Sequence, residues 1–141
     1  MTSKREQILA KIKTLLTGTT GVGTRIYRNR VTALAKSETP SIILEFITDD
    51  PSINTSTIDI LDWTLRIRIV VMVRHKTPDT KADATIKSLH AKIVTDPTLG
   101  GLAIDIRPST VSFEALDADT PAGIVTCEYE IDYRSTYNDL T

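Results

Sequence analysis

The chain has 141 residues and a formal net charge of −1; 40% of its residues are hydrophobic and 25% are charged. This balance is typical of a globular protein, and the length predicts one domain, residues 1–141, with a core of its own. The near-neutral charge argues against a general nucleic-acid binder, which is usually markedly basic. The single cysteine excludes an intrachain disulfide, and the longest apolar run, residues 69–73, is too short to span a membrane.

The N-terminal segment predicts an amphipathic helix over residues 3–17. Ser3 and Glu6 form an S-x-x-E capping box, and Gly18 is a stop signal. The same segment lacks the uncharged apolar stretch of a signal peptide. Its basic face lacks the large aromatic residues of a membrane-surface helix, so we expect a core helix covered by lysines and no membrane partner. Between the two signals, apolar side chains recur at helical spacing: Ile8, Leu9, Ile12, Leu15 and Leu16.

Strand signals follow this helix. After a glycine-rich turn, "RIYRNRV" (25–31) predicts a short strand and "SIILEFIT" (41–48) a stronger one. "DDPSINTS" (49–56) predicts a loop, because its aspartates, serines, asparagine and proline all favour turns. Strict alternation from Trp63 to Arg74 predicts a long strand with one apolar face and one partly basic face.

A second helix is predicted directly after this strand. Thr77 supplies a capping hydroxyl, Pro78 suits the first helical position, and Asp79 is an acid at the positive end of the helix dipole. The helix is expected to end before Pro97.

The C-terminal part predicts three more strands. "AIDIR" (103–107) and "TVSFEAL" (110–116) predict two short strands separated by Pro108, and "DADTPAG" (117–123) predicts a loop. Residues 126–136 alternate apolar and charged side chains, which predicts a closing strand. Grouped strands with two helices predict an α+β fold, a mainly antiparallel sheet with both helices packed on one face.

Motifs for catalysis or cofactor binding are weak. The turn "GTTGVGT" lacks the Gly-Lys-Ser/Thr of a phosphate-binding loop, and "RIYRNR" fits a solvated strand better than a nucleic-acid site. His75 and His90 have no ligand-spaced partners, and Cys127 falls on the apolar side of its strand, where a buried inert thiol is expected. We therefore predict no enzyme active site, no cofactor and no metal site.

Two charged strand faces remain as the candidate interaction surface. One is basic and the other acidic, so the two strands are either sheet neighbours that neutralise each other or surfaces that meet another subunit. Asp49 and Asp50, in the predicted loop, are further candidates. The full candidate set is Asp49, Asp50, Arg66, Arg68, Arg74, Glu128, Glu130 and Asp132.

The order of these segments resembles the tail terminator proteins of long-tailed bacteriophages, the minor tail protein U-like family. A serine, Ser135, separates Arg134 from Thr136, where such proteins commonly end in Tyr-Arg-Thr. The resemblance covers nearly the whole chain and depends on the order of the motifs. They are "TRIYRNR" after a glycine turn, "TPSIILEF", "DWTLRIRIVVMVRHK", "TPDTKADATIKSLHAKIVTD" and the final "EYEIDYRSTYNDL".

The resemblance implies a virion protein, assembled in the host bacterial cytoplasm, that forms a homohexameric ring. The ring would cap the head-proximal end of the tail tube, stop its polymerisation and contact the head connector, and DNA would pass through it without sequence-specific binding. The family has no catalytic residues to carry over. Alternatives are another neck protein, such as a head closure or tail completion protein, a small-ligand or peptide-binding module, and an unrecognised enzyme.

Overall fold

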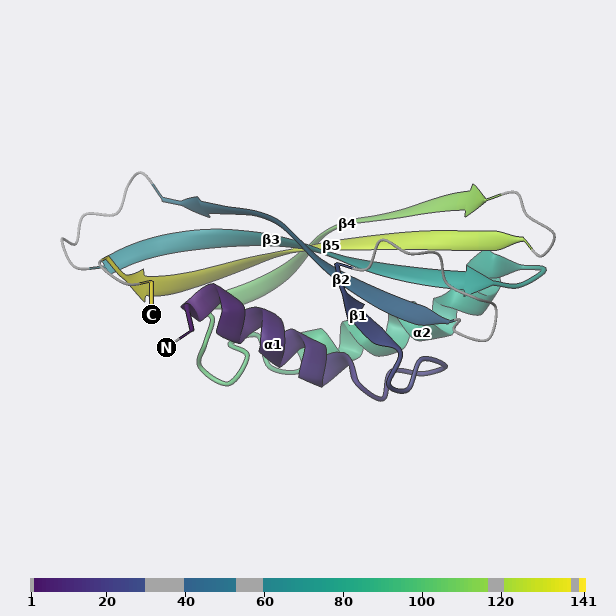
Figure 1. Cartoon of the computed structure of the whole chain (residues 1–141), viewed down its shortest axis with the longest axis horizontal. Coiled ribbons are helices and arrows are strands. Elements are labelled where there is room, and N and C mark those ends of the chain that lie inside the picture. Colours follow the sequence, from purple (N-terminus) through teal and green to yellow (C-terminus); the bar gives the residue numbers. More distant parts are fainter. Residues whose placement is uncertain (1, 30–39, 53–59, 117–120, 138–139) are drawn as a thin grey trace.

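A five-stranded sheet with both helices on one side forms the framework of the protein. The computed structural model describes residues 2–29, 40–52, 60–116, 121–137 and 140–141. The sheet order is β1-β2-β3-β5-β4, and Figure 1 shows the helices together below a strongly twisted sheet. This architecture confirms the predicted α+β fold. The elements are α1 (Lys4–Leu16), β1 (Ile26–Arg28), β2 (Ser41–Pro51), β3 (Ile60–Arg74), α2 (Pro78–Val94), β4 (Asp105–Leu116) and β5 (Ala122–Thr136).

Strands β3 and β5 are the centre of the sheet. They pair antiparallel without interruption, from Ile60 opposite Thr136 to Arg74 opposite Ala122. β2 and β4 flank this pair, also antiparallel, and only the short β1 runs parallel to its neighbour. The two strands predicted from alternation, residues 63–74 and 126–136, are therefore sheet neighbours. Side chains that lie opposite each other in this pair project from the same face of the sheet.

The core lies between the helices and one face of the sheet, here called the helix face. The alternating residues of β3 and β5 project into it, and both helices contribute their apolar stripe. The opposite, outer face carries the remaining side chains of the strands and is not covered by a helix in the described part of the chain. Fully buried members from each layer are Ile8, Ile12, Leu65, Ile67, Ile69, Leu89, Ile93 and Ile131.

Helix α1 forms as predicted. The Ser3 hydroxyl accepts a hydrogen bond from the Glu6 backbone N–H at 3.2 Å, as the capping box requires. Gly18 takes a φ of +87°, a left-handed conformation that ends the helix at little steric cost. The start of α1 also meets the other end of the chain, because the Lys4 N–H donates to the Leu140 carbonyl at 2.8 Å.

Helix α2 begins at Pro78 with Thr77 as its N-cap residue, as predicted, but the expected capping by the Thr77 hydroxyl is wrong. The Thr77 side chain makes no capping hydrogen bond, and its hydroxyl lies 3.2 Å from His75 Nδ1. Proline still suits this position, because its φ is preset for a helix and it lacks an N–H that would be left without an intrahelical partner.

Two predicted breaks in the sheet are absent. β2 continues through Asp49 and Asp50 to Pro51, where a loop was predicted; residues 53–56 of that loop lie outside the described residues. β4 is one strand through Pro108, with a register shift between Pro108 and Thr110, where two strands were predicted. Both prolines sit on strands with a free edge, and proline is tolerated there because no ladder hydrogen bond needs its missing N–H.

Two other predicted segments differ at their bounds. The strand predicted at 25–31 is β1, Ile26–Arg28, and residues 30 and 31 lie outside the described residues. The closing strand begins at Ala122, inside the predicted loop 117–123, whose first four residues also lie outside them. No helix in the described residues is both long and apolar enough to cross a membrane.

Candidate functional site

The predicted basic and acidic faces meet on the outer face of the sheet. Arg66 lies opposite Glu130 and Arg68 opposite Glu128, because β3 and β5 are antiparallel neighbours. The Arg66 guanidinium is 3.2 Å from the Glu130 carboxylate, and that of Arg68 is 3.5 Å from Glu128. Of the two arrangements that the sequence left open, the structure has the one within a single chain.

The flanking strands extend these pairs into a charge ladder across the sheet. On one side, Arg68 also contacts Glu45 of β2 at 3.3 Å. On the other, Arg107 of β4 contacts Glu130 at 2.9 Å and Asp132 at 2.6 Å. Each charged residue of the ladder therefore contacts at least one residue of opposite charge.

The ladder shifts the ionisation of its members. Burial disfavours the charged form of Asp132, but hydrogen bonds from Arg107 and from the Thr64 hydroxyl outweigh it and lower the pKa of this carboxyl. The Asp132 hydrogen bond in turn raises the pKa of Arg107. These groups therefore stay charged at neutral pH, and the outer face keeps its alternating pattern.

Beyond the ladder, the outer face becomes apolar. Ile43 and Val70 lie opposite each other on β2 and β3 and are buried. Tyr27, Met72 and Ile124 pack around them and are half-buried. The outer face is thus divided into a charged half and an apolar half.

Three of the predicted site residues lie apart from the ladder. Arg74 is the last residue of β3, opposite Ala122, at the opposite end of the strand from Thr64. Asp50 is exposed at the end of β2, opposite Thr64. The ladder therefore holds Arg66, Arg68, Glu128, Glu130 and Asp132, while Asp49, Asp50 and Arg74 lie elsewhere.

Asp49 faces the helices instead of solvent. Its side chain is 3% exposed and accepts hydrogen bonds from the Tyr133 hydroxyl and from Arg5 of α1, the latter at 3.4 Å. Desolvation raises the pKa of this carboxyl despite both contacts. The prediction that Asp49 lies in a polar contact loop is therefore wrong. The residue lies in β2, its side chain is buried, and it links α1 to the sheet.

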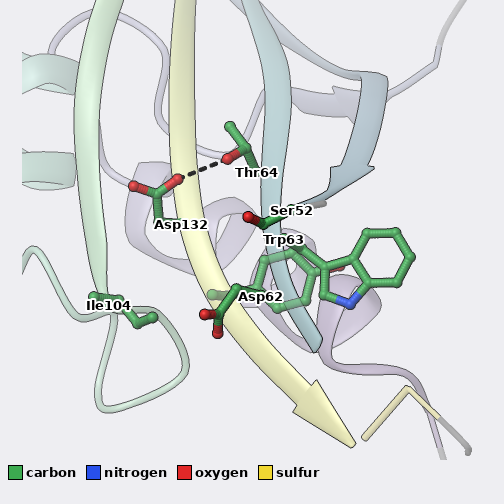
Figure 2. Close-up of a pocket in the computed structure, with 7 residues that line it drawn as sticks. Ser52, Asp62, Trp63, Thr64, Ile104 and Asp132 are labelled. Carbon is green, nitrogen blue, oxygen red and sulfur yellow. Dashed lines mark hydrogen bonds between the residues drawn. The ribbon is translucent and has the colours of Figure 1, made fainter. Parts of the chain in front are cut away.

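A cleft of about 280 Å³ opens at the end of the sheet that holds the last residues of β5. Figure 2 shows Thr64 and Asp132 side by side in it, with Asp62 below them and Ile104 directly before the start of β4. Asp62 is paired with Arg134 at 2.7 Å. The cleft thus combines two carboxylates with an exposed apolar residue, although both carboxylates already have arginine partners.

One cysteine and two histidines are the side chains with intrinsic reactivity outside the ladder. Cys127 is buried, and burial raises the pKa of its thiol to about 11, as expected for an unreactive cysteine. His90 Nδ1 lies 2.8 Å from the Tyr129 hydroxyl, and His75 lies in the turn before α2. In the described residues no three His, Cys, Asp or Glu side chains gather where they could hold a metal ion.

Three charged residues of the outer face were not among the predicted site residues: two belong to the ladder and one lies beside it. Glu45 and Arg107 join it because they lie on the outward side of β2 and β4, the neighbours of the central pair. Asp62 precedes the alternation from Trp63 and lies opposite Arg134. Alternation alone assigns such residues to a face, but strand order is needed to say which charges meet.

Comparison with models of known protein families gives no match, and a comparison with curated proteins finds no match either.

Proposed function

We propose that this chain is a phage tail terminator: a ring-forming structural protein that caps the head-proximal end of the tail tube and stops its extension. The observation that carries the proposal is the outer face of the sheet, a broad surface with a charge ladder at one end and apolar residues at the other. The order of elements, which resembles that family, supports the same function.

A capping ring needs contacts that close on themselves and a surface that does not repeat the tube. Head-to-tail contacts that close make rings, whereas those that do not close make filaments. The ladder suits such docking because charged patterns fix register and orientation more than they add affinity. Its charges are satisfied within the chain, so the face is stable both free and docked. The side chains stay accessible, since 58% of the Arg66 side chain is exposed.

Further elements of the proposal concern partners. The ring is a homohexamer that contacts the tail tube protein on one side and the head connector on the other. DNA passes through it without sequence-specific contacts, in keeping with the net charge of −1. The protein is assembled in the host cytoplasm and becomes part of the virion, and it carries out no catalysis.

Charge reversal tests the role of the outer face. We expect Arg66→Glu with Arg68→Glu to abolish rings in negative-stain images of the protein with tail tubes. The matched control is Lys81→Glu with Lys87→Glu, which makes the same change in net charge on exposed positions of α2. Urea unfolding of both variants separates lost assembly from lost folding. Rings that survive the arginine reversal would exclude the ladder from the ring contacts.

A phage with a stop codon in this gene tests the function itself. We expect lysates with full heads and separate tails that are overlong or fail to join heads. Normal-length tails attached to heads would rule out the terminator function. Tails of normal length that still fail to attach would indicate a different neck protein, one that joins heads to tails.

The cleft at the end of β5 supports a second candidate, a peptide-binding module for basic segments. Asp62 and Asp132 line it, and an incoming arginine or lysine would compete with Arg134 and Arg107 for them. Titration with a short Arg/Lys peptide, followed by tryptophan fluorescence of Trp63, tests this candidate. Binding that disappears in the Asp62→Asn variant would support it, and an unchanged spectrum at millimolar peptide would reject it.

A further inference from the structure

Among the described strands, β4 lies at the edge of the sheet and has one side without a partner strand. It pairs with β5 on one side, and no described strand lies on the other. Its second half, "TVSFEAL", carries only one charge, and its helix-face side chains are poorly covered: Val111 is 63% exposed and Phe113 48%. Such an edge is a template for pairing with another chain, and proteins normally cover or interrupt it.

An apolar groove runs beside this edge on the helix face. It has a volume of about 260 Å³ and lies between α2 and strands β4 and β5. Pro108 and Val111 of the edge strand line it, with Ile86 and His90 of α2 and Tyr129 of β5. The groove therefore reaches the free edge of the sheet, where a neighbouring strand could place a side chain in it.

We propose that two copies of this chain pair their β4 edges antiparallel, around a two-fold axis at Val111, with Phe113 of each copy seated at the groove of the other. This inference is independent of the proposed ring. It follows from a surface that is complementary to itself, as a two-fold interface requires.

On the helix face, the register of β4 against β5 shows which residues would face each other across the two-fold axis. Pro108, Val111 and Phe113 lie opposite Tyr129, Cys127 and Val125, so Pro108 and Phe113 are equally far from Val111 along the ladder despite the bulge. A two-fold axis at Val111 therefore places Phe113 of the second copy opposite Pro108. Because Pro108 lines the groove, that ring covers apolar surface that is exposed in the single chain.

The outer-face side chains of the two copies are also complementary in this register. Arg107 and Glu114 lie opposite Glu130 and Ile124, three positions on either side of the axis, so Arg107 of one copy faces Glu114 of the other. Thr110 likewise faces Ser112, which places two hydroxyls opposite each other. Opposite charges and hydroxyl pairs are the favourable cross-strand combinations.

Neighbouring registers lose this complementarity. An axis at Thr110 would place Glu114 opposite Asp105, two like charges, and an axis at Ser112 would place Glu114 opposite Thr110 and leave Arg107 without an acid across the edge. The free edge of β2 is a poorer partner. β1 already pairs with Ile42–Leu44, so only the far part of β2 is open, and a strand as long as β4 would meet β1.

Cysteine cross-linking tests the pairing and its register. Residues directly opposite in an antiparallel pair have Cα atoms about 4.5–5.5 Å apart, within the range that a disulfide bridges. We therefore expect Val111→Cys to form a disulfide-linked dimer under mild oxidation, seen on non-reducing gels. All cysteine variants carry Cys127→Ala, because Cys127 lies directly opposite Val111 on β5 and would otherwise form an intrachain disulfide with the new cysteine.

Two further variants are the matched controls. Thr110→Cys and Ser112→Cys should each cross-link poorly alone, since like residues lie diagonally at about 8 Å. A mixture of the two variants should cross-link efficiently, because Thr110 faces Ser112 across the axis. Light scattering of the wild type should give twice the chain mass, and Val111→Lys should give the mass of one chain with an unchanged circular dichroism spectrum.

Three other results would each overturn the proposal. A wild-type mass of one chain at about 100 μM would mean that the edges do not pair at a protein concentration typical of weak dimers. A dimer or ring in which Val111→Cys stays uncross-linked would place the contact elsewhere. Cross-linking of Ser112→Cys alone, equal to that of the mixture, would exclude the register.

Discussion

The guanidinium of Arg66 lies 3.2 Å from the carboxylate of Glu130, the residue directly opposite it on β5. Glu130 is shared, because Arg107 of β4 contacts the same carboxylate at 2.9 Å. One carboxylate thus joins three strands on the outer face. This arrangement contributes to register as well as to stability, since a one-residue slip would turn every one of these side chains to the helix face.

A double-mutant cycle on Arg66→Ala and Glu130→Ala measures this contact. We expect a coupling of about 0.2–1 kcal/mol in the free energy of unfolding, at the lower end because Arg66 is largely exposed. The control cycle pairs Arg66→Ala with Glu114→Ala, which lies six ladder positions away and should show no coupling. Zero coupling in both cycles would mean that the pair adds nothing to folding.

Trp63 is half-buried, less than its place at the start of the apolar face predicts. Its ring stacks on Tyr133 with centroids 6.3 Å apart, and its Nε1–H donates to the Ser135 hydroxyl at 2.8 Å. We expect native fluorescence to be blue-shifted and to move red on unfolding. Ser135→Ala should destabilise by about 0.5–1.5 kcal/mol, whereas Ser112→Ala, an exposed serine of β4, should have little effect. A native spectrum equal to the unfolded one would contradict the stacking.

The raised pKa of Asp49 predicts that the protein loses part of its stability as pH rises. Burial raises the pKa of its carboxyl, so the folded state binds a proton more tightly than the unfolded state. Its contribution to stability is therefore complete below the unfolded pKa and is lost as pH rises through the folded value.

The Asp49→Asn variant tests this sign. We expect wild type to lose stability relative to the variant as pH rises from about 3.5 to 7, measured by urea unfolding at each pH. Asp50→Asn is the control, since that carboxyl is exposed on the next residue. A wild type that gains stability relative to Asp49→Asn over this range would show that the Arg5 and Tyr133 contacts outweigh desolvation.

Gly123 is required for close packing at the start of β5. A Cβ atom there would lie 2.6 Å from Pro78 Cβ and 2.9 Å from Phe113 Cε2, both shorter than normal contacts. Gly123→Ala should therefore destabilise the protein by about 1–3 kcal/mol, the usual cost of overpacking. Thermal unfolding measures this, and a melting temperature within 2 °C of wild type would show that Pro78 and Phe113 move aside freely.

Local chemistry was sufficient to predict both helices and the central strand β3. The Ser3 capping box, proline at the start of α2 and alternation from Trp63 are short-range signals, and each one places its helix or strand correctly. The α+β class follows from their order. The alternation also predicted that the arginines of β3 and the carboxylates of β5 lie on single faces, because side chains of a strand alternate strictly.

Only the tertiary structure decided which of these faces meet and where a strand continues. Arg66 pairs with Glu130 because β3 and β5 are neighbours, a contact between residues 64 positions apart that no local pattern encodes. Asp49 and Pro108 have turn-forming chemistry, yet both lie in strands because β3 and β5 continue beside them and offer a hydrogen-bonded edge. Turn propensities are worth a few tenths of a kcal/mol to about 1 kcal/mol per residue, whereas a strand laid along a formed sheet gains several hydrogen bonds and buried side chains at once.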